Sequence, residues 1–225
     1  MFKSIIMDHV LPHVFEERRA QMKSDVWLQQ MQFDKGKLYL IEAASGTGKS
    51  SLCSYIFGYR KDFSGTITFD NPEIDGFRNR NIHELKVNEW VDIRKLSLSI
   101  LWQDLRLFPE LTAWENVMIK NNLTHGFQPV HQLNAWFDQL GIADKKHTLV
   151  GRMSFGQQQR VALIRSLCQP FDFLFADEPI SHLDDDNARI AGEIMMTEAR
   201  KQEAAVIVTS IGKHLDLPYN KVLKL

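Results

Sequence analysis

The chain has 225 residues, enough for one large α/β domain, or for one domain with an attached lobe, around a sizeable core. Lysine and arginine together number 27 and aspartate and glutamate 28, so the net charge is close to zero. This balance argues against a protein that binds nucleic acid through bulk charge, and no nucleic-acid partner is expected. The apolar share of 44% and the charged share of 24% are ordinary for a globular protein.

Cysteine content and hydropathy indicate a cytoplasmic chain. The two cysteines, Cys53 and Cys168, are too few for a disulfide framework or a metal cluster, and their apolar neighbours predict buried, reduced thiols. No run approaches the ~18 uninterrupted apolar residues of a membrane span, and Asp8 comes too early for a signal peptide. A role at a membrane would therefore need another polypeptide that crosses it.

The first half of the chain alternates short apolar runs with a helical segment. Residues 38–41 predict a strand, which is followed by a loop of small residues and by a helix over 51–57. Residues 65–69 come after a turn and predict a second strand, and residues 96–102 predict a third.

The middle of the chain, from about residue 104 to 155, is predicted to be helical. Gly141 supplies a stop for one of these helices. The apolar residues that recur there at helical spacing are Leu133, Trp136, Phe137 and Leu140. Residues 171–176 and 205–209 then predict two buried strands. Strands this rich in Ile, Val, Leu and Phe, separated by helices, predict a parallel sheet that is covered on both faces.

Residues 43–50, with the sequence AASGTGKS, lie between a predicted strand and a predicted helix. A phosphate-binding P-loop needs this context, because glycines let backbone N–H groups turn toward phosphate oxygens at the positive end of the helix. We expect Lys49 to reach the β- and γ-phosphates and Ser50 to hold Mg²⁺. The strict pattern has glycine where this chain has Ala43, and alanine fits if its φ is negative. The alternative is a glycine-rich turn with a chance lysine, which the flanking strand and helix disfavour.

Two carboxylates, Asp177 and Glu178, follow the apolar run 173–176. The carboxyl end of a strand is the ligand edge of a doubly wound sheet. We expect Asp177 to hold Mg²⁺, through water, and Glu178 to polarise the water that attacks the γ-phosphate. Many strands end in acids, so this signal gains its weight from the P-loop upstream.

Three further segments resemble the motifs of ABC (ATP-binding cassette) ATPases. Residues 153–160 (MSFGQQQR) resemble the signature motif, residues 179–184 (PISHLD) the loop that follows the acidic strand end, and residues 101–117 the Q-loop with its LTxxENV segment. The order and the spacing match that family from about Lys35 to the C-terminus. Length and motif wording are most similar to the compact branch that serves lipoprotein-release, macrolide-export and cell-division complexes.

The resemblance implies a fold and a division of the chain. The expected fold is the α/β core of a P-loop NTPase with a mainly parallel sheet, an N-terminal antiparallel sheet region and an inserted helical subdomain. All of 1–225 would form one nucleotide-binding domain. The core would comprise about 1–103 and 159–225, and the helical subdomain about 104–158.

The resemblance also implies a function: an ATPase that powers a membrane-embedded transporter. Two such subunits, of the same or different chains, would close head to tail on ATP, so that the signature of one caps the γ-phosphate held by the other. The expected partners are a transmembrane permease and this second subunit, at the inner face of the cell membrane. The permease surface is expected within 107–121, which carries Phe108, Leu111 and Trp114; packing within the lobe is the alternative.

Site residues follow from the same resemblance. Catalysis is expected from Glu178, Gln103, Lys49 and Ser210, and Mg²⁺ binding from Ser50, Gln103 and Asp177. Nucleotide contacts are expected from Ala43, Ala44, Ser45, Gly46, Thr47, Gly48, Lys49, Ser50, Ser51, Phe15, Ser154, Gly156, Gln157 and Asp184. Phe15 would stack on adenine, with Trp27 as the next candidate, and a core role is the alternative for either ring. The alternatives are that Ser154 is only a helix cap and that Gln103 is only a solvated loop residue.

Two residues depart from the family pattern in ways that bear on catalysis. Phe155 replaces the first glycine of the signature pair, and Ser210 stands where the family has a histidine that contacts the γ-phosphate. Serine can donate one hydrogen bond but cannot carry positive charge, so slowed hydrolysis is expected. His214 lies too far along to substitute and is expected at the surface.

These departures favour one alternative function, an ATP-dependent clamp that barely hydrolyses. An ABC ATPase of ribosomes or DNA is disfavoured, because those relatives usually carry two cassettes or a coiled coil, and this chain shows one cassette and no heptad run. A P-loop kinase would not need residues 153–157.

Overall fold

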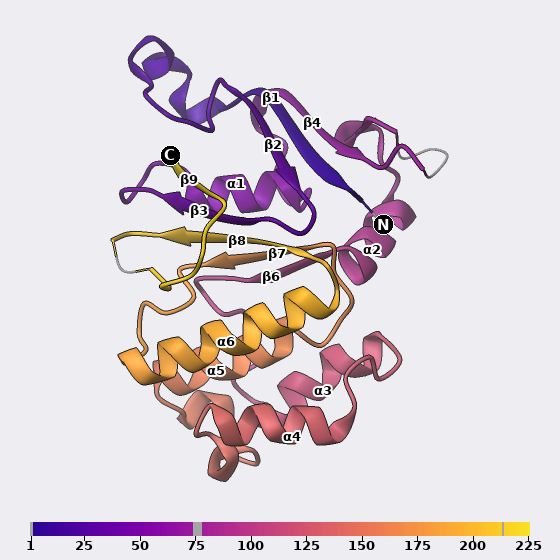
Figure 1. Cartoon of the computed structure of the whole chain (residues 1–225), viewed down its shortest axis with the longest axis vertical. Coiled ribbons are helices and arrows are strands. Elements are labelled where there is room, and N and C mark those ends of the chain that lie inside the picture. Colours follow the sequence, from indigo (N-terminus) through magenta and orange to yellow (C-terminus); the bar gives the residue numbers. More distant parts are fainter. Residues whose placement is uncertain (1, 74–77, 213) are drawn as a thin grey trace.

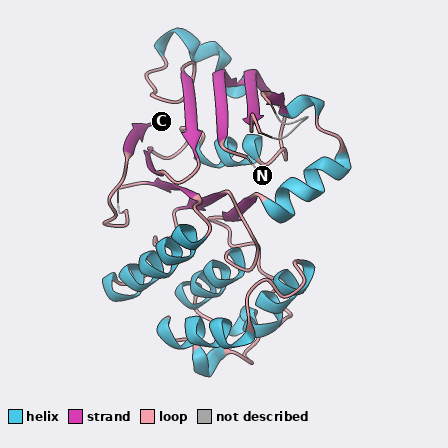
Figure 2. Cartoon of the chain, turned by 45° about the vertical axis from the view of Figure 1, so that its right-hand side comes forward, coloured by secondary structure: helices cyan, strands magenta, loops and turns pink. Residues whose placement is uncertain are grey.

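Two β-sheets and a set of helices build the molecule, a computed structural model that describes residues 2–73, 78–212 and 214–225 (Figure 1). The strands gather in one half, and α3 and α4 lie well apart from them beneath α5 and α6 (Figure 2). None of the described helices combines the length and the apolar character that a membrane crossing needs. Cys53 and Cys168 are both buried free thiols, as expected.

The first sheet is parallel throughout. Its order is β6 (Leu98–Leu101), β7 (Phe173–Asp177), β8 (Ala205–Ser210), β3 (Leu38–Glu42) and β9 (Lys221–Lys224). The predicted parallel sheet is therefore confirmed. The strand predicted over 96–102 is too long, because Leu96 ends helix α2 (Val87–Leu96). This helix, which the apolar pattern did not reveal, begins where the Glu89 carboxylate accepts from the Lys86 N–H at 2.7 Å.

The second sheet is antiparallel and uses the N-terminal part of the chain. Its order is β2 (Gln30–Asp34), β1 (Ser4–Pro12), β4 (Phe63–Asp70) and β5 (Arg80–Asn81). The strand predicted at 65–69 lies inside β4. The antiparallel region that the family resemblance implied is confirmed.

Helices cover the parallel sheet on one face, and a helix with the second sheet covers the other. The helices besides α2 are α1 (Lys49–Ile56), α3 (Ala113–Leu123), α4 (Val130–Gln139), α5 (Phe155–Ser166) and α6 (Asp185–Lys201), with 3₁₀ turns at His13–Gln21, Ile82–Glu84, Ala143–Lys145 and Val150–Arg152. Helices α5 and α6 lie below the sheet in Figure 1, while α1 and the antiparallel sheet lie above it.

Strand β7 is apolar from Phe173 to Ala176 because both of its faces are covered. Leu174 and Ala176 join the core formed with α5 and α6, whereas Phe173 and Phe175 join the core formed with α1 and the antiparallel sheet. Successive side chains of a strand point to opposite faces, so a strand covered on both faces needs apolar residues throughout. The same alternation on β8 splits its residues between the two cores.

Helix α6 is specified by its ends and by one apolar stripe. The Asp184 side chain accepts from the Asn187 amide and caps the first turn, while Arg200 and Lys201 lie at the negative end of the helix dipole. The buried stripe is Ala188, Ala191, Met195 and Ala199, at spacings of three and four. Its small residues let α6 pack closely on the sheet.

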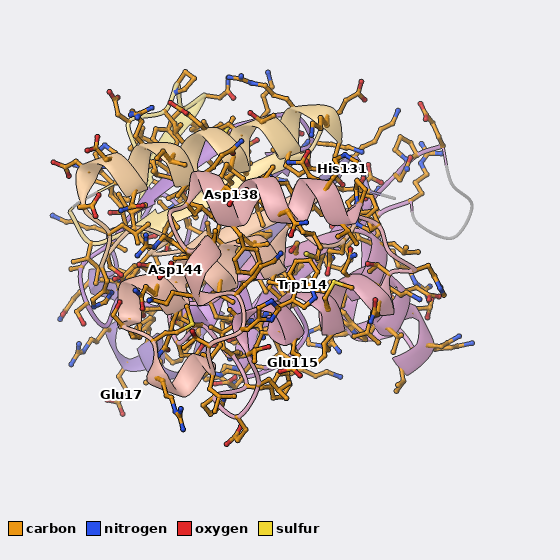
Figure 3. All side chains as sticks on the ribbon, turned by 90° about the horizontal axis from the view of Figure 1, so that it is seen from below. Glu17, Trp114, Glu115, His131, Asp138 and Asp144 are labelled. Carbon is orange, nitrogen blue, oxygen red and sulfur yellow. The ribbon has the colours of Figure 1, made fainter. Side chains whose placement is uncertain are left out.

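The helical region behaves largely as the apolar spacing predicts. Leu133, Trp136 and Phe137 are buried, and Gly141, with a φ of 62°, ends α4. Seen from below, α4 turns labelled polar residues such as His131 and Asp138 outward (Figure 3). Helix α5 runs through the boundary expected at residue 158, and the division into core and helical subdomain stays a prediction.

Of the three apolar residues expected on the lobe surface, the structure exposes one. Phe108 is 51% exposed. Leu111 and Trp114 are only half-buried, and Trp114 packs against the Phe137 ring and beneath the Lys146 ammonium. Packing within the lobe, the alternative for these residues, therefore applies to Trp114, whereas Leu111 is partly exposed.

Candidate functional site

The carboxyl ends of three neighbouring strands bring the predicted motifs together. Strands β3, β7 and β8 run in parallel, with Asp177 opposite Thr209 and Glu42 opposite Ser210. A cavity of about 360 Å³ opens at this edge. Its lining residues are Val14, Phe15, Ser45, Gly46, Gly48, Lys49, Ser50, Ser51, Gln103, Glu178 and Ile211. A cavity of about 470 Å³ lies between α4 and α6, but its lining contains none of the predicted motifs.

The loop between β3 and α1 turns on two glycines. Gly46 has a φ of 80° and Gly48 a φ of 100°, in the left-handed region that glycine adopts at little cost. A Cβ at Gly48 would lie 3.1 Å from ring atoms of both Phe15 and Trp27. Ala43 does not have a positive φ, so the condition for alanine at that position is met.

The P-loop leaves its backbone donors open. Gly48 caps α1 without a side-chain hydrogen bond. Within the described part of the chain, the amides of residues 45–51 donate to no backbone carbonyl. Unsatisfied amides at the positive end of a helix form a binding site for anions, and a phosphate chain fits such a cradle.

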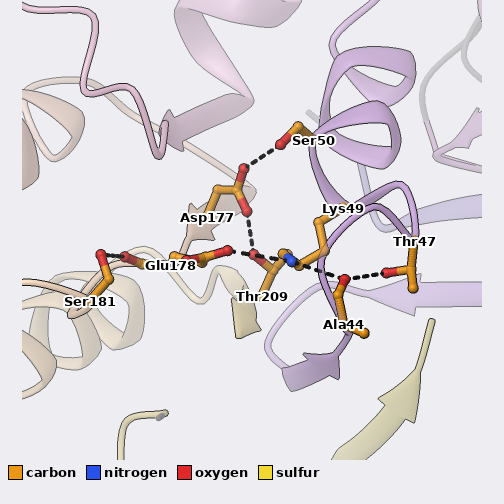
Figure 4. A network of polar contacts seen from close by, with 8 residues as sticks. All are labelled: Ala44, Thr47, Lys49, Ser50, Asp177, Glu178, Ser181 and Thr209. Carbon is orange, nitrogen blue, oxygen red and sulfur yellow. Dashed lines mark hydrogen bonds and ion pairs between the residues drawn. The ribbon is translucent and has the colours of Figure 1, made fainter. Parts of the chain in front are cut away.

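Lys49 and Glu178 meet inside the cavity (Figure 4). Lys49 is only 6% exposed, and its Nζ lies 3.4 Å from Glu178 Oε1 and 3.4 Å from the Ala44 carbonyl oxygen. Glu178 Oε1 is buried and has no hydrogen-bond partner among the described residues. Its close partner is thus the Lys49 ammonium, in an ion pair without a hydrogen bond, so Oε1 can still accept a hydrogen bond from a water or another ligand.

Glu178 is also held in an uncommon backbone conformation. Its φ is 50°, and its N–H donates to the Thr209 carbonyl at 3.2 Å. Left-handed backbone at a bulky non-glycine residue is strained, and such strain persists only where the surroundings impose it. The turn aims the Glu178 side chain back toward the P-loop rather than onward along β7.

Asp177 is anchored by two hydroxyl groups. Ser50 Oγ donates to Asp177 Oδ2 at 3.2 Å, and Thr209 Oγ1 donates to Oδ1 (Figure 4). Hard divalent cations such as Mg²⁺ prefer carboxylate and hydroxyl oxygens, so Ser50 and Asp177 suit a magnesium site. Thr209 was not foreseen, because only the pairing of β7 with β8 places it beside Asp177.

Phe15 and Trp27, the two candidates for stacking on the base, differ in their exposure. Phe15 is half-buried and lines the cavity. Trp27 is 1% exposed, and its Nε1 donates to the Thr47 carbonyl at 2.9 Å. Trp27 is therefore a support beneath the P-loop and not a stacking surface, which corrects its place as second candidate.

At the rim, Gln103 is exposed and lines the cavity. Ser210 is 2% exposed and is not among the lining residues, whereas the next residue, Ile211, is. The Ser210 carbonyl accepts from the Ala43 amide, which ties the end of β8 to the P-loop. His214 is exposed, as expected.

The signature residues lie outside this cavity. Ser154 caps α5 in a reciprocal box: its Oγ accepts from the Gln157 N–H at 3.3 Å, and its own N–H donates to Gln157 Oε1 at 3.0 Å. Ser154, Gly156 and Gln157 are absent from the cavity lining. Asp184 likewise caps α6, and the Asn187 N–H lowers the pKa of its carboxyl. In a single chain, Ser154 and Gln157 therefore satisfy each other, and Asp184 is hydrogen-bonded to Asn187.

Phe155 packs on His182, which lies in the segment after Glu178. Its ring is 43% exposed and lies 4.3 Å from the His182 ring, in an edge-to-face arrangement. A Cβ at Gly156 would lie 2.8 Å from the His182 carbonyl oxygen, so this position requires glycine. The Phe155 side chain thus turns onto His182, which accommodates the departure from the signature pattern.

Gln159 joins the signature helix to the acidic strand end. Its Nε2 donates to the Glu178 carbonyl at 3.0 Å, and its Oε1 accepts from the His182 N–H at 3.3 Å. Gln159 is buried, so loss of this bridge would leave buried polar groups unpaired. No sequence pattern showed the bridge, because its partners come from a different segment.

Comparisons with known proteins agree with these motifs. The family model described as "ABC transporter" matches residues 29–181. The "Lipoprotein-releasing system ATP-binding protein LolD" of Leptospira interrogans is 28% identical over 183 residues, which are 80% of this chain and 73% of that protein. The "Macrolide export ATP-binding/permease protein MacB" of Bdellovibrio bacteriovorus is 25% identical over 195 residues, 87% of this chain and 29% of that protein.

Solved structures carry the same fold. The dimeric, post-hydrolysis state of the ATP-binding cassette MJ0796, bound to ADP and Pi, superposes with a TM-score of 0.68 over 92% of this chain and 87% of that one, at 22% identity. The predicted fold class and the resemblance to the lipoprotein-release and macrolide-export branch are thus confirmed. From its motifs, its fold and the extent of the family match, this chain belongs to the ABC transporter family, as a nucleotide-binding subunit.

Proposed function

We propose that this protein binds and hydrolyses ATP and thereby powers a membrane-embedded transporter or related complex. The observation that carries the proposal is the meeting of Lys49 with Glu178, and of Ser50 with Asp177, around a loop whose amides are open. Phosphate binding, cation binding and activation of water each need one of these groups. Lys49, Ser50 and Glu178 line one cavity, and Asp177 is hydrogen-bonded to Ser50 at its edge.

The P-loop would hold the phosphate chain. Its open amides and the Lys49 ammonium would neutralise the charge on the β- and γ-phosphates. Ser50 and Asp177 would hold Mg²⁺, which supplies further charge neutralisation there. The remaining loop residues, from Ala43 to Ser51, would shape the cradle through their backbone. Phe15 would stack on the adenine.

Glu178 would act as the general base. Its Oε1 atom is ion-paired with Lys49 but accepts no hydrogen bond from the described residues, so it could accept one from the attacking water and draw off its proton. Gln103 would orient that water or complete the cation site from the rim. The Lys49 side chain now facing Glu178 would move to the phosphates when ATP arrives, which would free the carboxylate.

A second nucleotide-binding subunit would complete the site. The signature residues Ser154, Gly156 and Gln157, with Asp184, do not line the cavity of their own chain, so they would act on nucleotide held by a partner in a head-to-tail dimer. The dimeric MJ0796 cassette has the same fold and supports this arrangement. Nucleotide bound between two subunits favours the closed dimer, and its hydrolysis loosens it.

The proposed permease contact is a groove of about 310 Å³ between the sheet and the helical lobe. Its lining includes exposed apolar side chains such as Phe108 and Ile119. Four cations also line it, namely Arg94, Arg106, Lys120 and Arg165, and no carboxylate does. A permease segment that carries apolar residues and an acid would fit this surface, which would hold the protein at the inner face of the membrane.

Steady-state turnover of Mg-ATP by the purified chain tests the proposal, with Glu178→Gln as the blank. The expected result is turnover that falls by about 10²-fold or more in the blank, with ATP binding retained. Turnover equal to that of the blank, in wild-type protein that binds ATP, would contradict autonomous hydrolysis.

The second candidate, a regulatory clamp, is favoured by Ser210 and Phe155. Serine cannot place a positive charge on the γ-phosphate, so we propose that hydrolysis is slowed. A clamp predicts that wild-type protein forms stable ATP-bound dimers with intact nucleotide. Size-exclusion chromatography followed by analysis of the bound nucleotide separates the two functions, because a working ATPase accumulates such dimers only as Glu178→Gln.

A further inference from the structure

The loop that follows Gln103 contains two consecutive residues in the left-handed region. Leu105 has a φ of 57° and Arg106 a φ of 49°, although neither is glycine. The turn is tight, with the Arg106 N–H donating to the Asp104 carbonyl at 2.6 Å. Such a pair is strained and stays in place only when neighbouring groups hold it.

One side chain from helix α5 holds both residues. Arg165 donates from one guanidinium nitrogen to the Leu105 carbonyl at 2.6 Å and from the other to the Arg106 carbonyl at 2.7 Å. No ion pair joins Arg165 to a carboxylate in the described part of the chain. Burial lowers the pKa of Arg165 to about 10, so it remains charged at neutral pH and binds these carbonyls as a cation.

The turn held by Arg165 lies between the nucleotide cavity and the proposed permease groove. Just before it, Gln103 lines the nucleotide cavity. Arg106, within it, and Phe108, just after it, line the proposed permease groove, and the Arg106 guanidinium lies 3.7 Å from the centre of the Trp102 ring. Arg165 belongs to the helix that begins at the signature residue Phe155.

We infer that Arg165 is a positioning residue, which holds the turn 103–106 in its strained form and so keeps Gln103 at the nucleotide cavity. This inference rests on the proposed ATPase function. Because the two residues are strained, the turn should relax when its two hydrogen bonds to Arg165 are lost.

The first test is Arg165→Met, which removes both hydrogen bonds and keeps a long side chain. We expect kcat to fall about tenfold or more, with the dissociation constant for ATP within about twofold of wild type, because geometry is lost rather than the phosphate contacts. An unchanged kcat would overturn the inference.

The decisive test relieves the strain by a second substitution. In the Arg165→Met background, Arg106→Gly lets the turn adopt its φ freely and should restore kcat to within about threefold of wild type. Arg106→Ala removes the same side chain but keeps the strain, so it should not restore kcat. Equal kcat values for the two double variants would show that Arg165 has only a general structural role.

Amide hydrogen exchange tests the inference without any measurement of ATP hydrolysis. In full-length Arg165→Met, exchange should accelerate over 103–108 and stay unchanged over the strands of the parallel sheet. If wild-type protein fails to hydrolyse ATP, the proposed function is wrong, but hydrogen exchange still tests whether Arg165 holds the turn in place. Unchanged exchange over 103–108 would overturn it.

Discussion

Helices α1 and α5 both present an N-terminus to the functional region, but they treat their free amides in opposite ways. Helix α1 starts at Gly48 with no side-chain cap, and the amides of residues 45–51 donate to no carbonyl in the described part of the chain. Helix α5 starts at Ser154, whose reciprocal box with Gln157 satisfies its own first turn. The first end is open to a ligand in the single chain; the second must give up its cap before it can bind one.

The difference indicates the order in which the two halves of the proposed site would bind nucleotide. An open helix end lowers stability but is prepared for an anion, whereas a capped end contributes to stability until a stronger partner arrives. The P-loop would therefore bind nucleotide first, and the signature would join only when a second subunit brings a phosphate to it.

The largest expected effect is at the open end. Lys49→Met removes the buried cation of the cradle, and we expect ATP affinity to fall by about 10²-fold, since charge-assisted hydrogen bonds to phosphate are lost. Isothermal titration calorimetry measures this. The exposed Lys37, replaced in the same way, is the control. Comparable losses for both variants would show that α1 is not the anion site.

Gly48→Ala should also weaken the phosphate site at the open end of α1, through steric crowding rather than loss of charge. The new Cβ would sit at a φ of 100° and 3.1 Å from the rings of Phe15 and Trp27. We expect a loss of about 1–3 kcal/mol in the free energy of unfolding and at least tenfold weaker ATP binding. Gly126→Ala, at a φ of 72° with open space around it, carries strain without crowding. Denaturant melts and ATP titrations of both variants separate the two causes, and equal behaviour would rule out crowding.

Ser210→His probes the third strand end, where the family pattern has a cation. If the missing charge slows hydrolysis, this variant should raise turnover about three- to tenfold. Ser210→Asn has a side chain of intermediate size without an imidazole and serves as the control for crowding at this buried position. Unchanged turnover in a folded Ser210→His protein would show that Ser210 does not limit the reaction.

The smallest effect is expected at the capped end. Ser154→Ala should lower the free energy of unfolding by about 1 kcal/mol, as loss of a helix cap does, while ATP binding to the single chain stays unchanged. Thr112→Ala removes the equivalent box from α3 and is the matched control for stability. Only Ser154→Ala should also weaken the ATP-dependent dimer, measured by analytical ultracentrifugation. A dimer equally sensitive to both variants would contradict the proposed role of the α5 end.

Local patterns predicted the parts of the site that each depend on a single segment. The P-loop and the acids at 177–178 follow from residue type and spacing, as does the helix cap given as the alternative for Ser154, because backbone conformation there is decided by near neighbours. The pattern failed for Trp27 and Trp114, since an aromatic ring looks alike in sequence whether it faces a cavity or a core. The start of α2 was missed because its N-cap residue is Lys86, whose side chain cannot accept a hydrogen bond from the first turn.

By itself, the sequence determined the α/β class with its parallel sheet, the approximate positions of five strands, and the groups available for phosphate, cation and water; the strands β1, β2, β5 and β9 were not predicted. Only the tertiary structure decided that Thr209 supports Asp177, that Gln159 joins Glu178 to the signature helix, and that Arg165 clamps the turn after Gln103. Apolar periodicity and turn chemistry act over a few residues and are visible in one segment. A hydrogen bond between distant segments depends on how strands align and helices pack, and packing of the whole chain sets that geometry.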